Sequence, residues 1–230
     1  MSNTETDKFR QLSPLLLDLQ ARFLQIRTLA EPDNVDKEAL LNIQLLSQHA
    51  LMTLDYALFA ANVLQTKMPL TSISAAAAAR EVADNLDQLA KSYDVELGLD
   101  ITPKMELIFA NEAAVKGALY GLASSLMTVR QTTDKKLRIV IAAQETLPNI
   151  QRLGIYSPDI MIKPSAIKLA RLLSGCARTI APNEIHHSGL GLLVSDQLVQ
   201  ALGSKLMRFV HRGQKGVGFY VPMSAQLSFL

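Results

Sequence analysis

The stretch HHSGLGLLVSDQLVQALGS, residues His186–Ser204, places Gly-Leu-Gly-Leu directly before an amphipathic helical pattern. The pattern stops at Gly203, and glycine commonly follows a helix because it adopts a positive φ without strain. A glycine loop at the start of a helix exposes backbone N–H groups that can bind a phosphate. The stretch therefore predicts a helix that ends at Gly203 and begins at a loop with the shape of an anion site.

The composition excludes several classes of protein. A chain of 230 residues with 49% hydrophobic residues is typical of one large or two smaller globular domains. Its net charge of +2 indicates neither a nucleic-acid binder nor a membrane-surface protein. The single Cys176 excludes an internal disulfide and a cysteine-based zinc site. The polar N-terminus and the absence of an apolar run near the roughly 20 residues of a membrane span predict a cytoplasmic protein without membrane insertion.

The first 68 residues carry two helical stripes separated by a break at Pro32. They predict an antiparallel hairpin over residues 1–68. Two copies of the hairpin would bury both stripes as a four-helix bundle in a homodimer. Alternatively, the hairpin packs on the rest of its own chain. The first stripe is Phe9, Leu12, Leu16, Leu19, Phe23 and Ile26, and the second is Leu40, Ile43, Ala50, Leu54, Ala57, Ala61 and Leu64.

Residues 69–230 mix helical and strand patterns. The segment from Ser72 to Leu97 begins as an alanine-rich helix. VELGLDI, LRIVIAAQ and NIQRLGIYS read as strands, and KLMRFVH with GVGFYVPM reads as a terminal hairpin. Helices that group with a mostly antiparallel sheet indicate the α+β class, here an α/β sandwich.

This order of motifs resembles the catalytic core of bacterial sensor histidine kinases, from about Asp7 to Pro222. In that family a dimerisation hairpin precedes a Bergerat-type ATPase domain. The family's second glycine box, the following glycine pair and the closing strand motif match this chain in series. The matching residues are His187, Ser188, Gly189, Leu190, Gly191 and Leu192, then Gly203 and Ser204, then Gly216, Val217, Gly218, Phe219 and Pro222.

The residues that carry the family's chemistry differ in this chain. The phosphoacceptor position falls on Phe9, which has no nucleophile, although Pro14 and its neighbours fit the box. The family has two asparagines on one helix turn, one of which binds Mg²⁺, and these two positions fall on Gly121 and Ser125. The first glycine box has a candidate aspartate, Asp159, but no glycine follows it.

The glycine loop therefore has two interpretations. In the first, Gly189 and Gly191 serve backbone geometry only, and the protein binds no cofactor and no metal ion. In the second, residues His187–Leu192 still bind ATP, ADP or another anion, aided by a charge on His186 and His187 near pH 6.

His49 is the other candidate residue, because the architecture is also similar to histidine phosphotransferases with a degenerate kinase fold. It lies beside the apolar stripe of the second helix, so we expect it to be exposed to solvent. It is either a plain flanking histidine or a phosphoacceptor. His211, in the terminal hairpin, is expected to be a solvated surface residue.

The resemblance implies a function in two-component signalling. We expect a pseudo-histidine-kinase, a dimeric binding module rather than an enzyme. Its partners would be a receiver domain of a response regulator or an active histidine kinase, docked around Phe9, Leu12 and Pro14. A histidine phosphotransferase that uses His49 and a weak nucleotide-binding regulator are the alternatives.

Overall fold

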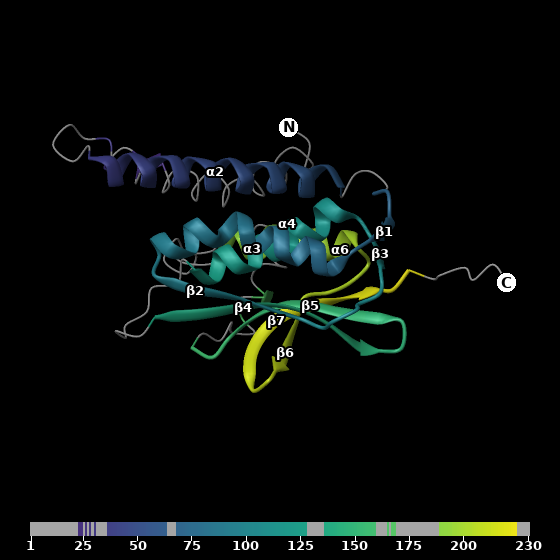
Figure 1. Cartoon of the computed structure of the whole chain (residues 1–230). Helices are drawn as coiled ribbons and strands as arrows, with labels where there is room; N and C mark the ends of the chain where they lie inside the picture. Colours follow the sequence, from purple (N-terminus) through teal and green to yellow (C-terminus); the bar gives the residue numbers. More distant parts are fainter. Residues whose placement is uncertain are drawn as a thin grey trace.

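The computed structural model describes residues 23–24, 26, 28, 30, 36–63, 68–127, 136–159, 165, 167–168 and 189–224. These residues form a layered structure (Figure 1). Helix α2 (Lys37–Val63) lies across the top, above a layer of three helices. These are α3 (Ala75–Ser92), α4 (Glu112–Met127) and α6 (Gly189–Ala201), and a β-sheet lies beneath them.

The main sheet has five strands in the order β2-β4-β5-β7-β6. β2 runs parallel to β4, and every other neighbouring pair is antiparallel. One face of the sheet packs on the helical layer through side chains such as Ile139, Ile141 and Leu153, which are fully buried. The predicted α+β sandwich is thereby confirmed. The strands are β2 (Val95–Ile101), β4 (Leu137–Leu147), β5 (Ile150–Ser157), β6 (Met207–His211) and β7 (Gln214–Pro222).

Two short strands were not predicted from the sequence. β1 (Thr71–Ile73) pairs with β3 (Ile108–Ala110) in a separate antiparallel sheet. The predicted helix from Ser72 therefore begins later, because the hydroxyl of Ser74 accepts a hydrogen bond from the N–H of Ala77 and caps α3. Three-residue strands are too short to show a periodic pattern in the sequence.

Helix α6 ends as predicted but begins earlier. Gly203 has a φ of 75°, and the N–H of Ser204 donates a hydrogen bond to the carbonyl of Val199 at 3.0 Å, as at a glycine helix terminus. At the other end, Gly189 and Gly191 lie within the first turn of α6. The glycines therefore belong to the helix, where the sequence had predicted a loop before it.

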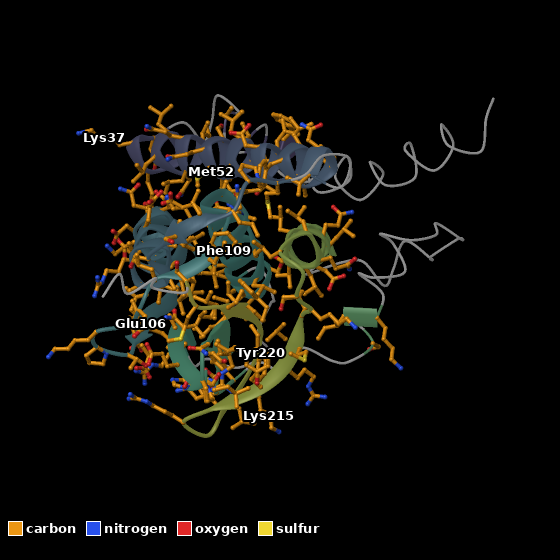
Figure 2. The ribbon with its side chains drawn as sticks, turned by 90° about the vertical axis from the view of Figure 1, so that its right-hand side faces the viewer. Lys37, Met52, Glu106, Phe109, Lys215 and Tyr220 are labelled. Carbon is orange, nitrogen blue, oxygen red and sulfur yellow. The ribbon has the colours of Figure 1, made fainter. Side chains whose placement is uncertain are left out.

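Helix α2 is buried along one side by its own chain. Ala60 is part of the same buried cluster as residues of α3 and α4, and Met52 packs against that cluster. Figure 2 shows Met52 on the side of α2 that faces the helical layer. The other helix of the predicted hairpin lies outside the described residues, except that Phe23, Leu24, Ile26 and Thr28 are helical. No helix of the described part combines the length and hydropathy needed to cross a membrane.

Candidate functional site

The candidate site lies where α4 and α6 cross. A Cβ atom placed on Gly121 would lie 2.6 Å from the carbonyl oxygen of Gly191 and 2.5 Å from the Oγ of Ser195. A Cβ atom on Gly191 would meet the carbonyl oxygen of Gly121 and the Oγ of Ser125 at even shorter distances. Real Cβ atoms do not approach other atoms so closely. The two helix backbones are therefore in direct contact, and only glycine permits it.

A serine hydroxyl forms a hydrogen bond across the same crossing. The Oγ of Ser195 on α6 lies 2.8 Å from the carbonyl oxygen of Ala118 on α4, and 2.6 Å from that of Gly191 in its own helix. Ser195 is fully buried, and a buried hydroxyl without a hydrogen bond would be costly to remove from water. The two carbonyl oxygens provide the Ser195 hydroxyl with acceptors. Ser124 and Ser125 on α4 are also buried. Small side chains thus line both helices at the crossing.

The residues predicted for the glycine box fall into two groups. Gly189, Leu190, Gly191 and Leu192 open α6, and the Leu192 side chain is buried. His187 and Ser188 lie outside the described residues. Gly121 and Ser125, which the resemblance in the sequence matches to the family's asparagines, face Gly191 across the crossing. The structure therefore places the two segments predicted to be motifs in direct contact with each other.

His49 is buried, and the predicted exposure to solvent is wrong. Its side chain is on the face of α2 that packs on the helical layer, and only 2% of the residue is exposed. The Nδ1 of His49 forms a hydrogen bond with the hydroxyl of Tyr120 on α4. The rings of His49 and Tyr120 are 5.4 Å apart, and those of Tyr56 and Tyr120 are 5.5 Å apart. The sequence could not show this burial, because it depends on what lies opposite α2.

The remaining predicted residues are not part of the crossing. Phe9, Leu12 and Pro14 lie outside the described residues. The carboxylate of Asp159, just after β5, accepts a hydrogen bond from the backbone N–H of Arg138 at 3.3 Å. Its own N–H donates to the hydroxyl of Ser157 at 3.2 Å.

The sheet carries a polar cluster around His211 that the sequence did not predict. The Nε2 of His211 lies 2.7 Å from the carboxylate of Asp100, and its Nδ1 lies 2.9 Å from the side-chain amide nitrogen of Gln144. The His211 side chain is only 10% exposed, so the predicted solvated surface position is wrong. Asp100 and His211 are 111 residues apart in sequence, and no local pattern joins them.

No protein-family model and no curated protein matches the chain. The catalytic domain of the histidine kinase ThkA is 16% identical with a TM-score of 0.52, over 68% of this chain and 98% of that domain. The Acinetobacter baumannii histidine kinase AdeS is 16% identical with a TM-score of 0.51, over 92% of this chain and 95% of AdeS.

A third similar structure is full-length ShkA in complex with AMPPNP. It is 16% identical with a TM-score of 0.57, over 96% of this chain and 45% of ShkA. All three similar structures are histidine kinases or their catalytic domains. Like them, the described residues combine a five-stranded mixed sheet with the helices α3, α4 and α6 on one face. The chain has the fold of the catalytic core of histidine kinases.

Proposed function

We propose that the protein is a pseudo-histidine-kinase, a dimeric binding module of two-component signalling that acts without phosphorylation of its own. Its partner is a response-regulator receiver domain or an active histidine kinase. The observation that carries the proposal is the contact between Gly121 and Gly191. The resemblance implies that Mg²⁺ and the nucleotide phosphates bind between the asparagine-box helix and the glycine box.

The chemistry at the crossing supports this proposal. Mg²⁺ requires oxygen ligands in an open octahedral arrangement and usually keeps several waters. Gly121 has no side chain, and the Oγ of Ser125 is buried within the helix contact. A Mg²⁺–nucleotide complex would have to separate α4 from α6 and break the hydrogen bond between Ser195 and Ala118.

The outer face of α2 supports a dimer. Leu40, Leu51 and Leu58 lie on one side of the helix, opposite His49, and all three are largely exposed. Their spacing places them within about 20° of one another around the helix axis. Exposed leucines in a row at this spacing are typical of a face that packs on another helix. A second copy of the hairpin provides such a face.

The alternative of a phosphotransferase that uses His49 requires a large movement. A receiver domain must bring its aspartyl phosphate within reach of the imidazole, and His49 is covered by α4. The alternative of a weak nucleotide-binding regulator requires the crossing to open. Neither alternative has an observation in its favour among the described residues.

Three measurements on the purified chain test the proposal. Thermal unfolding is followed with and without Mg-ATP and Mg-ADP, and we expect no shift in the midpoint. The chain is incubated with labelled Mg-ATP, alone and with an active histidine kinase, and we expect no labelled phosphate on it. Binding to purified receiver domains and to the kinase is then measured directly, and we expect one of them to bind.

Each failure points to a different alternative. A midpoint that rises with ATP concentration supports the nucleotide-binding regulator. Acid-labile phosphate on His49 after incubation with a phosphorylated receiver domain supports the phosphotransferase. Label at stoichiometric amounts after incubation with ATP alone overturns the pseudokinase altogether.

A further inference from the structure

We propose that His49 and Tyr120 form a latch that holds α2 on the helical layer and keeps the histidine-bearing face of α2 from any partner. The latch is a conformational device of the fold and does not depend on the proposed signalling function. It is built from His49, Tyr56 and Thr53 on α2 and from Gly117 and Tyr120 on α4.

Side chains of the neighbouring helices lie directly over Gly117 of α4. A Cβ atom there would lie 2.6 Å from the Cδ1 of Tyr56 and 2.7 Å from the Cδ1 of Leu198 on α6. The Tyr56 ring therefore occupies the space above Gly117, in contact with the Tyr120 ring. This burial raises the pKa of the Tyr56 hydroxyl above its usual value. One aromatic side chain of α2 thus fits a notch that exists only because α4 has a glycine.

The polar part of the latch makes it cooperative. His49 and Tyr120 are each 2% exposed, and the hydrogen bond between them joins two groups that have been removed from water. Losing one partner leaves the other buried without that bond, which costs more than the bond itself contributes. The hydroxyl of Thr53 donates a hydrogen bond to the backbone carbonyl of His49 at 2.8 Å, so this hydroxyl, which is also buried, has a partner within α2. We therefore expect α2 to be either fully seated or released.

The latch decides which face of the hairpin is available. With α2 seated, the side that carries His49, Thr53 and Ala60 is buried, and the leucines of the opposite side are exposed. Release would expose His49 together with the tyrosine rings. The latch therefore keeps the leucine face of α2 directed away from the helical layer and the histidine face buried against it.

The test uses three variants of the full chain: Tyr120→Phe, His49→Phe and the double variant. Hydrogen exchange of α2 amides is measured, together with the rate at which diethyl pyrocarbonate modifies His49, resolved by mass spectrometry. Tyr120→Phe removes one oxygen and keeps the ring, so we expect about tenfold faster exchange in α2 and about tenfold faster modification of His49. Tyr220→Phe is the matched control, because Tyr220 is on β7 at the opposite side of the molecule from α2 (Figure 2).

The double variant separates a latch from a general loss of stability. We expect it to exchange about as fast as either single variant, and not at the product of the two increases, because both variants remove the same bond. Three outcomes overturn the latch. They are unchanged exchange of α2 in Tyr120→Phe, equal acceleration of α2, α3 and α4, and modification of wild-type His49 as fast as in an unstructured peptide. None of these outcomes bears on nucleotide or receiver binding.

Discussion

The imidazole Nε2 of His211 lies 2.7 Å from the carboxylate of Asp100, although these residues belong to opposite edge strands of the five-stranded sheet. The β6–β7 hairpin curves below the sheet, on the side turned away from the helices (Figure 1), and the His211 ring lies 5.0 Å from that of Tyr156 on β5. The Nε of Arg212 lies 2.8 Å from the same carboxylate. Asp100 thus accepts from two donors of the hairpin and joins the two edges of the sheet.

Asp100→Asn tests the contribution of this contact to stability. The variant keeps the shape of the side chain but removes the charge that both donors face, and the side chains of Asp100 and His211 are mostly buried. We expect the free energy of unfolding in urea to fall by about 1–2 kcal/mol. Glu96→Gln is the control, because Glu96 pairs with Arg138 at 3.5 Å with both side chains exposed, and should cost less than about 0.5 kcal/mol. Equal losses in the two variants would contradict the prediction.

The burial of Tyr156 predicts that the free energy of unfolding falls in alkaline solution. Burial raises its pKa from 10.0 to about 12, so the unfolded chain ionises this group before the folded protein does. Stability from this residue is fully present below pH 10 and is lost as the pH rises toward 12. Urea unfolding between pH 9 and pH 12 should therefore be less steeply pH-dependent in Tyr156→Phe than in the wild type. Parallel curves would show that Tyr156 does not titrate as its burial predicts.

Gly121→Ala tests the helix crossing. The added methyl group would meet the Gly191 carbonyl and the Ser195 hydroxyl, so α6 must shift away from α4. We expect a loss of about 1–3 kcal/mol in the free energy of unfolding. Gly98→Ala on β2 is the control, because its Cβ would have its nearest neighbour at 3.7 Å. A tolerated Gly121→Ala would mean that the helices separate easily and would weaken the case against a nucleotide.

Leu51→Glu tests the proposed dimer. Leu51 is 62% exposed on the outer side of α2, so the substitution should leave the fold of the single chain intact. In a four-helix bundle it places a charge in an apolar contact, and we expect sedimentation of the wild type as a dimer and of the variant as a monomer. Leu147→Glu is the control, since Leu147 is 53% exposed at the end of β4, in the sheet and not on the N-terminal helical hairpin. A monomeric wild type would contradict the bundle.

Phe9→Ala tests the predicted docking surface on the first helix. An aromatic residue at the acceptor position would give a receiver domain an apolar contact, and truncation of a buried aromatic anchor commonly costs about 2 kcal/mol. We expect binding to weaken by about tenfold or more while the dimer persists. If the variant loses its dimer and binds partners as before, Phe9 belongs to the core of the bundle.

Local signals in the sequence predicted several elements of the fold. The alternation in VELGLDI gave β2 with its observed bounds, and Gly203 marked the end of α6. These features depend on neighbours a few residues away, so they are readable from the chain. β1 and β3 were missed for the opposite reason, because strands of three residues depend on partners that are distant along the chain.

The sequence by itself determined that Gly121 and Ser125, the positions that the resemblance matches to the family's two asparagines, carry no amide side chain, since that depends only on residue type. Only the tertiary structure decided that Gly121 meets Gly191, that His49 lies against Tyr120 and that His211 reaches Asp100. Each of these pairs joins elements that are distant along the chain. Whether a side chain is buried or hydrogen-bonded depends on which element packs against it. A helical stripe in the sequence does not specify that element.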